Sequence, residues 1–421
     1  MSKDVNPNGS CIEKGTWTAL PFGPPEDTSV TFQAPAGKLT FHMVGCSGDP
    51  SVIGPGLAVA AGMADQVTHP PEGEVAPAFL YHLGDIAYTD HGSDMTADLW
   101  NTQFFKQYKG YTPPIFAIAG NHDGKAGKHS PDTAEITFFR RNMCGTAGKV
   151  SPDNTADPSR TETAQPYPYW RLDTPQAYII GLYSNVSNGG VLDDPSALTK
   201  PGDFKDGPQY KWLVDQLTHC LKRADGRAVL LALHYPPYNG AVDFLERGNP
   251  KFGADNVYPN ATPIGKVLQE AYDESGQTPD AVFSAHSHLY QRLTVSYSSG
   301  GKVVRQVPHF VVGCGGHGPL ELMAKKCDGG TATFLSTSFD LFAKGNPPAG
   351  LSAPTDATVT VDFWADGTDA GHQPFGFLRV TVEASLVCEF FAVACDAAGK
   401  AAGPAVLKDS CTVDLAAHVL K

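Results

Sequence analysis

The sequence predicts a layered α/β domain whose C-terminal part is mainly β. Between about residues 39 and 290, short apolar segments bounded by Gly and Pro alternate with amphipathic segments, which is the pattern of strands and helices in such a domain. Beyond about residue 350 the chain alternates in β fashion, as in "ATVTVDFW" and "FGFLRVTVEASLVCEFFAV", and this suggests a second sheet packed on the first. The 421 residues suffice for a large core. We expect residues 1–37 to be an irregular lead-in and residues 38–421 to form the domain, including its β-rich part.

The predicted elements follow one another in a regular order. Segments that are apolar and short are predicted as strands, at 38–45, 77–85, 113–123, 227–237, 279–288 and 302–316. Segments with apolar residues at helical spacing are predicted as helices, at 56–67, 93–110 (with Ser93 as the cap), 130–143, 207–225 and 264–275. Residues 169–185 are predicted as a hairpin. The polar stretch from Cys144 to Pro168 is predicted to run over the surface.

Composition limits the function. The net charge of −13 argues against a basic nucleic-acid groove. No apolar run reaches the roughly 18 residues of a membrane span. The start "MSKDVNPNGSCIEKG" lacks the apolar region of a secretory signal, so we expect a cytoplasmic protein, or a secreted or periplasmic one whose leader was removed.

Cysteine usage adds little about function. The nine cysteines contain no C-x-x-C pair, which excludes a zinc ribbon or a thioredoxin-type motif. Cys388, Cys395 and Cys411 cluster near the C-terminus. They could form a disulfide in an oxidising compartment or stay as reduced, buried thiols.

Polar side chains of the metal-binding type follow four of the predicted strands. These residues are Asp85 and Tyr88, then Asn121, His122 and Asp123, then His234, and finally His286 and His288. Sites in open α/β sheets gather at the carboxyl ends of strands, so the four groups should converge. In an extended strand His286 and His288 would share one face. Two inert, hydrogen-bonded histidines at a strand end are the alternative for that pair alone.

The residue types suit a centre with two metal ions. A carboxylate such as Asp85 can bridge two ions, imidazole suits zinc or iron, and a Tyr phenolate favours a trivalent ion. Two cations lower the pKa of a bound water and clamp the attacking and leaving oxygens of an in-line displacement. The pattern therefore predicts hydrolysis of a phosphoester.

The motifs "GDIAY", "GNHD", "LALH" and "AHSH", in this order, resemble those of the calcineurin-like metallophosphoesterases, and most closely the purple acid phosphatases. "HYPPYN", "HSHLYQR", "QYKWL" and "FGFLRVTV" are also similar to stretches of the latter family. The likeness covers roughly residues 39–395. It implies a four-layer αββα sandwich of two mixed β-sheets flanked by helices, and a metal-bound hydroxide acting on a small phosphorylated substrate.

The resemblance also implies residue roles. Asp85 would bridge two ions, expected to be Fe(III) and a divalent ion (Fe, Zn or Mn). Tyr88 and His288 would bind the first ion, and the second ion would be held by Asn121, His234 and His286. His122 would contact the phosphate or protonate the leaving oxygen, and Asp123 would orient His122 through a hydrogen bond.

The first motif departs from the family. The family has an Asp at the end of its first strand, whereas this chain has "FHMVGCSGDP". Cys46 replaces the Asp in a strict alignment, and Asp49 supplies a carboxylate if the strand exit is slightly longer. We favour Asp49, because a hard trivalent ion prefers a carboxylate. Cys46 as an added thiolate ligand stays open, since the similar PhoD-like phosphatases carry a Cys next to this position.

Two other functions compete with an acid-phosphatase-like phosphomonoesterase. The same site would suit a phosphodiesterase. The altered first motif also allows a metal-poor pseudo-enzyme that binds a phosphorylated partner. His317, near a Gly-rich turn, is a candidate substrate contact. Sequence alone gives neither the natural substrate, the metal pair nor the oligomeric state.

Overall fold

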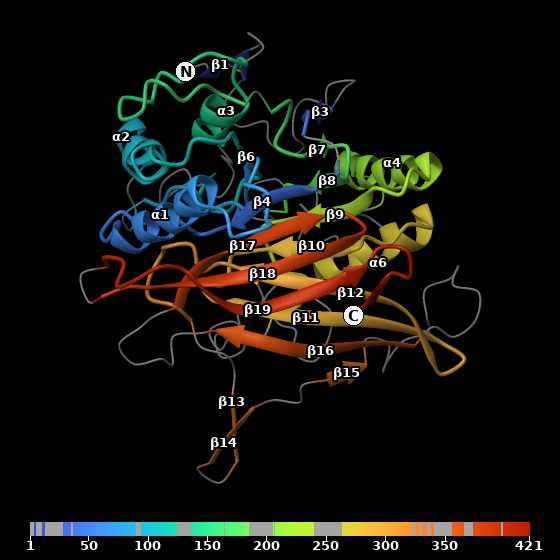
Figure 1. Cartoon of the computed structure of the whole chain (residues 1–421). Coiled ribbons are helices and arrows are strands. Elements are labelled where there is room, and N and C mark those ends of the chain that lie inside the picture. The colour runs from blue at the N-terminus through green and yellow to red at the C-terminus, as the bar shows by residue number, and fades with distance from the viewer. Residues whose placement is uncertain are drawn as a thin grey trace.

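The computed structural model contains two β-sheets packed face to face between layers of helices (Figure 1). It describes residues 4–5, 11–12, 28–34, 37–89, 94–123, 136–163, 165–184, 205, 207–239, 263–321, 325–328, 331–334, 338–340, 356–365, 374–396 and 399–421. Within these residues the architecture is the four-layer αββα sandwich, and the fold prediction is confirmed.

One sheet contains nine strands and is mixed. In spatial order its strands are β15 (Ser338–Asp340), β16 (Asp356–Ala365), β11 (Tyr290–Ser299), β12 (Lys302–Val312), β10 (Ala281–Ser284), β9 (Ala228–Ala232), β8 (Ala177–Gly181), β7 (Trp170–Asp173) and β3 (Ser29–Thr31). Strands β8, β9, β10 and β12 are parallel to one another. Strands β7 and β8 form the predicted hairpin.

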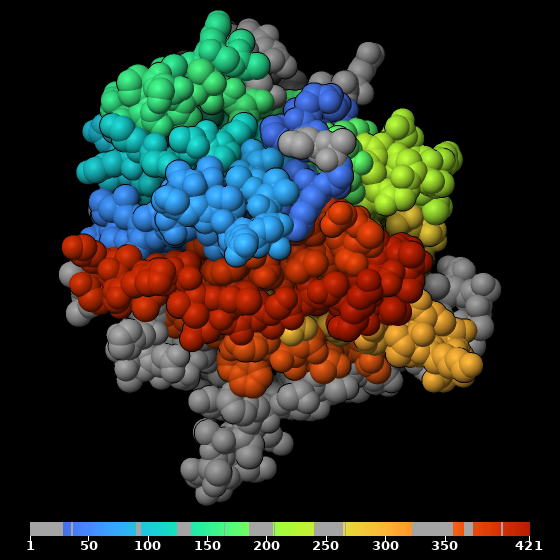
Figure 2. All heavy atoms as spheres, viewed as in Figure 1, coloured from blue at the N-terminus to red at the C-terminus, as the bar shows by residue number. Residues whose placement is uncertain are grey.

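The other sheet has seven strands. In spatial order they are β20 (Val419–Leu420), β19 (Val406–Asp414), β18 (Ser385–Ala394), β17 (Pro374–Val382), β4 (Leu39–Val44), β5 (Leu80–His82) and β6 (Ile115–Ala117). Strands β4, β5 and β6 are parallel, whereas the C-terminal strands are antiparallel. The β-rich end of the chain therefore extends the sheet that starts with β4. Figure 2 shows these C-terminal strands (red) in continuous contact with the N-terminal part of the described chain (blue).

Helices cover the outer faces of both sheets (Figure 1). They are α1 (Gly54–Thr68), α2 (Ala97–Trp100) with the π-helix η1 (Asn101–Phe105), α3 (Thr137–Met143), α4 (Pro208–Arg223) and α6 (Pro263–Ser275). A Cβ added to Gly62 of α1 would lie 3.3 Å from Phe377 and 3.2 Å from Val393, so α1 packs directly on β17 and β18. Helices α4 and α6 lie side by side on the other sheet. None of the helices in the described part of the chain is both long and apolar enough to cross a membrane.

The helix predicted over 93–110 differs from the structure. The helical segment begins at Ala97, where the Thr96 hydroxyl accepts the Leu99 N–H at 3.2 Å, and Ser93 lies outside the described residues. After Trp100 the hydrogen-bond pattern changes to that of a π-helix. Periodicity alone does not distinguish this local change.

Aromatic side chains fill the space between the two sheets. Tyr81 of β5 stacks on Trp170 of β7, with ring centroids 5.9 Å apart, and Tyr290 of β11 stacks on Phe390 of β18 at 3.8 Å. An ion pair lies beside the second stack, because Arg292 donates to Asp409 of β19 at 2.8 and 3.0 Å. These contacts fix the two sheets relative to each other.

The stretch from Cys144 to Pro168 runs in part over the surface, where residues 146–150, 152, 155, 158, 159 and 161 are exposed, but several of its polar residues are buried. Ser151, Asp153, Asn154 and Asp157 are buried because they bond one another and nearby loops. Gln165 is also buried, where its amide pairs with the main chain of Ala117. The buried polar groups named here therefore have hydrogen-bond partners within the protein.

The predicted lead-in is described only in part. Asp4–Val5 (β1) and Cys11–Ile12 (β2) pair with each other, and β3 joins the nine-stranded sheet beside β7. Cys388, Cys395 and Cys411 are free, buried thiols, with Cys388 opposite Cys411 in the β18–β19 ladder.

Candidate metal centre

Six parallel strands, three from each sheet, end at one edge of the sandwich. The loops that follow β4, β5 and β6 meet the loops that follow β9, β10 and β12. Main-chain hydrogen bonds join them: the Gly45 N–H donates to the Val312 carbonyl at 2.9 Å, the Cys46 N–H to Gly84 at 3.0 Å, and the His317 N–H to Cys46 at 3.0 Å. Residues far apart in sequence are therefore held together at the carboxyl ends of their strands.

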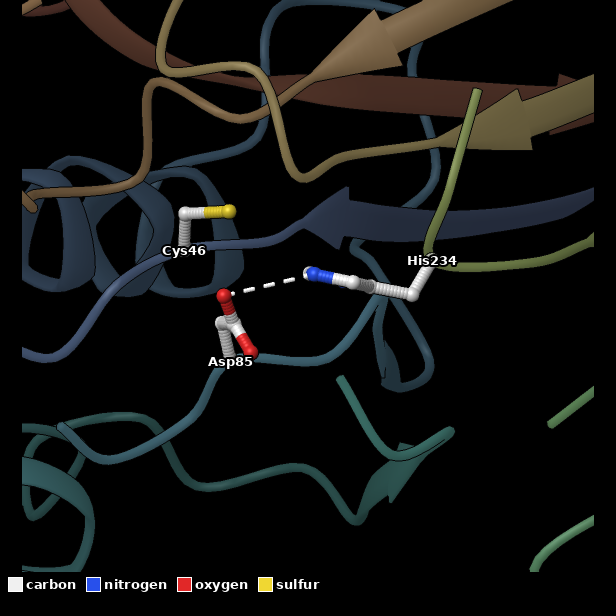
Figure 3. Close-up of side chains that lie close together, drawn as sticks. All are labelled: Cys46, Asp85 and His234. Carbon is white, nitrogen blue, oxygen red and sulfur yellow. Dashed lines mark ion pairs between the residues drawn. The ribbon is translucent and has the colours of Figure 1, made fainter. Parts of the chain in front are cut away.

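Three buried side chains form the middle of the site (Figure 3). Cys46, Asp85 and His234 each offer a ligand atom, and these atoms all lie within 4.8 Å of one another. Their exposed fractions are at most 1%. A thiol, a carboxylate and an imidazole that converge in a buried space are a donor set suited to a transition metal.

His234 presents its Nε2 atom to the site. Its Nδ1 lies 2.8 Å from the Leu83 carbonyl oxygen, which can only accept, so Nδ1 carries a proton. Nε2 lies 3.3 Å from Asp85 Oδ2 and 3.1 Å from Asn121 Oδ1. Burial alone would lower the pKa of His234, but the Asp85 carboxylate raises it above its ordinary value. Two oxygen atoms face Nε2, so a proton or a metal ion bound to this nitrogen would interact favourably with both of them.

Tyr88 links Asp85 to the histidine of the other sheet. Its hydroxyl donates to Asp85 Oδ2 at 3.1 Å and lies 3.2 Å from His288 Nε2. It also hydrogen-bonds Cys46. Burial, together with the Asp85 charge, raises the pKa of both the Tyr88 phenol and the Cys46 thiol. A bound cation reverses this effect and favours the phenolate and the thiolate.

His286 and His288 face the same centre from the loop after β10. The His286 ring centroid lies 5.1 Å from that of His234, and burial lowers the pKa of His286. Burial also lowers the pKa of His288, to about 3. Both imidazoles are therefore neutral near pH 7, as a metal ligand must be. The predicted strand geometry for this pair is wrong, because β10 ends at Ser284 and His286 has a φ of 64° in a turn.

Backbone strain concentrates at this site. Cys46, Asp85 and His286 have φ values of 52°, 54° and 64°, in the left-handed region that costs energy for residues with a Cβ. Gly120 allows the close approach of Asp85, since a Cβ there would lie 2.3 Å from Asp85 Oδ1. Such strain persists where the surrounding structure holds side chains in a functional arrangement.

His122 and Asp123 lie in the loop after β6. The His122 N–H donates to Asp85 Oδ1 at 2.7 Å, and its ring lies 4.2 Å from that of Tyr88. The Asp123 carboxylate accepts main-chain N–H groups of Gly120 at 2.9 Å and Ile86 at 2.8 Å. Burial raises the pKa of Asp123 to about 7. These bonds give Asp123 a role in shaping the loop, while its orientation of His122 stays a prediction.

Asp49 lies outside the trio of ligand atoms among the described residues. Its Oδ1 accepts the N–H groups of Ser51 and Val52, both at 2.8 Å, ahead of helix α1. Its Oδ2 lies 3.6 Å from His317 Nδ1. The assignment of Asp49 as a metal ligand therefore stays a prediction, and the Cys46 thiol lies nearer to Asp85 and His234.

His317 packs on the site, and its contact with a substrate stays a prediction. Its ring stacks on Tyr88 with centroids 3.8 Å apart, and lies 4.6 Å from His288. Its Nδ1 donates to the Gly48 carbonyl at 2.9 Å. Sequence reasoning missed Gln103 and Ser184, which bond the main chain of Tyr88 and His234. Neither residue could be recognised from the sequence, because a single polar residue in a predicted helix (Gln103) or hairpin (Ser184) is common.

The model of the calcineurin-like phosphoesterase family matches residues 63–290, which is more than half of the chain. The chain belongs to the calcineurin-like phosphoesterase family. The family recognition made from the motifs is thereby confirmed, and the protein is a metal-dependent hydrolase of phosphoester bonds. Its buried thiol, carboxylate and imidazole agree with metal binding in this family.

Solved structures with a similar fold were also found, all at low sequence identity. GAP50, the anchor in the inner membrane complex of Plasmodium, is 10% identical with a TM-score of 0.46, over 89% of this chain and 90% of that one. PhoD is 13% identical with a TM-score of 0.48, over 94% and 73%. A dimetal phosphatase from Danio rerio is 11% identical with a TM-score of 0.40, over 88% and 98%. No curated protein sequence matches the chain.

Proposed function

We propose that this calcineurin-like phosphoesterase is a phosphomonoesterase of the purple-acid-phosphatase type with two metal ions. The observation that carries the proposal is the position of Asp85. The Tyr88 hydroxyl and His234 Nε2, which come from loops of the two different sheets, contact its Oδ2 atom at 3.1 and 3.3 Å, and the main-chain N–H of His122 donates to Oδ1 at 2.7 Å. A buried carboxylate that lies between ligand-type groups of the two sheets is suited to bridge two cations.

The proposed ligands divide into two sets around Asp85. The first ion would be held by Cys46, Tyr88 and His288, and the second by Asn121, His234 and His286. In this proposal Cys46 takes the place that the sequence assigned to Asp49. The Tyr88 phenolate favours Fe(III) at the first position, the softer Cys46 thiolate suits iron or zinc, and a divalent ion (Fe, Zn or Mn) suits the second position.

The residues of the chain have distinct tasks in hydrolysis. When bound, two cations supply the charge that lowers the pKa of a water and stabilises the phosphoryl oxygens. His122 lies beside Tyr88 and Asp85, where its imidazole would bind the phosphate or protonate the leaving oxygen as the P–O bond breaks. His317, stacked on Tyr88, would line the space for the substrate.

The test combines metal content with turnover. Purified protein should contain two metal equivalents and hydrolyse p-nitrophenyl phosphate, and chelation should abolish this activity. Asp85→Asn and His286→Ala should each lower kcat/KM by at least about 100-fold, the size of effect seen when one charge-stabilising group is removed. Intact hydrolysis in these variants would contradict the proposal.

The same preparation separates the competing functions. Faster hydrolysis of bis-p-nitrophenyl phosphate than of p-nitrophenyl phosphate would identify a phosphodiesterase with the same site. Less than one metal per chain and no turnover would instead indicate a pseudo-enzyme that binds a phosphorylated partner. The buried thiol at Cys46, in place of a carboxylate, is the feature that keeps this last outcome in the test.

A further inference from the structure

Three buried glutamines pair with the main chain in the same way. The side-chain amide of Gln103 accepts the Tyr88 N–H and donates to the Tyr88 carbonyl, both at 2.8 Å. Gln165 does the same with Ala117 at 2.6 and 2.7 Å, and Gln209 with Tyr183 at 2.9 and 3.1 Å. Each glutamine thus makes the two hydrogen bonds of one rung of a β-ladder with a single main-chain residue.

Gln103 differs from the other two in what its partner does. Tyr88 directs its hydroxyl to Asp85 at 3.1 Å and to His288 at 3.2 Å. Gln103 also lies against the loop after β4, because a Cβ added to Gly48 would come within 2.5 Å of Gln103 Oε1. One side chain therefore contacts two of the three loops that carry the proposed ligands of the first ion, those with Cys46 and Tyr88.

The local helix explains how a glutamine reaches this position. Gln103 lies in the π-helix η1, where the chain makes a wider turn than in an α-helix. Its neighbours are anchored by aromatic contacts, since Phe104 packs on Trp100 with centroids 5.7 Å apart and on Tyr108 at 5.6 Å. Single π-helical turns occur frequently at functional sites, where they redirect a side chain.

We propose that Gln103 is a positioning residue that fixes Tyr88 for the first metal ion and so sets the affinity of that ion. Its two hydrogen bonds hold the main chain of Tyr88, whose phenol then lies 3.1 Å from Asp85 Oδ2 and 3.2 Å from His288 Nε2. The inference rests on the proposed metal centre, and it concerns metal binding rather than turnover.

The experiment measures metal affinity in protein freed of metal with a chelator. Co²⁺ is titrated into each variant, and its visible absorption spectrum reports binding without any substrate. Gln103→Ala should weaken binding by about 10–100-fold, the usual effect of removing a group that orients a metal ligand. Gln165→Ala and Gln209→Ala remove the same kind of pairing and are matched controls. They should lower the thermal midpoint as Gln103→Ala does, with Co²⁺ affinity unchanged.

A second pair of variants tests the route through Tyr88. Gln103→Glu keeps the acceptor for the Tyr88 N–H and should recover part of the affinity; it also serves if Gln103→Ala does not fold. In a Tyr88→Phe background, removal of Gln103 should have little further effect, because the phenol that it positions is gone. Equal losses in Gln103→Ala and in the two controls, or the full loss in the Tyr88→Phe background, would overturn the proposal.

The outcomes also separate this proposal from the proposed function. Wild-type protein that binds Co²⁺ but hydrolyses no phosphoester would contradict the function and leave the Gln103 comparison valid. Wild-type protein that binds no Co²⁺ would overturn the assignment of Gln103 as well.

Discussion

Cys46→Ser and Asp49→Ala should separate metal binding from loop stability. Asp49→Ala removes two hydrogen bonds of 2.8 Å to the N–H groups of Ser51 and Val52, and the contact with His317. Each such bond contributes about 0.5–1.5 kcal/mol net, so the free energy of unfolding should fall by about 1–3 kcal/mol. Since Asp49 lies outside the trio of ligand atoms, the metal content should stay at the wild-type value.

Cys46→Ser, in contrast, should lower the metal content of the protein. The thiol is fully buried and touches the Asp85–Tyr88 pair, so its loss removes a ligand directly. Loss of a supporting group alone costs about 10–100-fold in metal affinity, and loss of a ligand should exceed that range. The assay is elemental analysis after dialysis, with a thermal melt of the same sample. Metal retained in Cys46→Ser but lost in Asp49→Ala would refute this reasoning and restore Asp49 as the ligand.

Three further predictions concern stability. Burial lowers the pKa of His309 to about 3, so between pH 6.5 and 3 the unfolded chain binds a proton there that the folded chain does not. Acidification should therefore lower the free energy of unfolding of the metal-free protein by up to about 1.4 kcal/mol per pH unit. In His309→Gln the slope of this free energy against pH should be smaller by the contribution of one proton. Asp409→Asn removes the carboxylate that pairs with Arg292 at 2.8 Å and leaves Asp362 as the remaining partner of the guanidinium, so it should cost about 1–3 kcal/mol, measurable by denaturant unfolding; an unchanged midpoint would contradict a stabilising role of this ion pair between the sheets. Chelation should lower the thermal midpoint of the wild type in proportion to its metal affinity, and addition of the metal should restore it.

Much of the site could be predicted because its chemistry follows strand ends. Asp85, Asn121, His234 and His286 each come directly after an apolar strand, and parallel strands bring their carboxyl ends to one edge. Neither the residue types nor their order needs side-chain detail to be recognised. The two sheets follow from the family resemblance, since periodicity gave strands and helices but not their layers.

What could not be predicted depends on local backbone geometry. The proposed preference for Cys46 over Asp49 rests on a positive φ at Cys46 and on the turn that Asp49 stabilises, and neither has a signature in a single sequence. The pair His286 and His288 was placed on a strand, whereas the chain turns at His286. Gln103 falls within the helix predicted over 93–110, and periodicity does not show the π-helical turn there, because such a turn differs from an α-helical one by a single residue.

The most direct test of the account is a crystal structure of the metal-loaded protein with anomalous scattering recorded at the metal absorption edges. We expect two anomalous peaks on either side of the Asp85 carboxylate, one beside Cys46 and Tyr88 and the other beside His234. Peaks absent from this position, or a single ion bound by Asp49, would contradict the assignment of the centre.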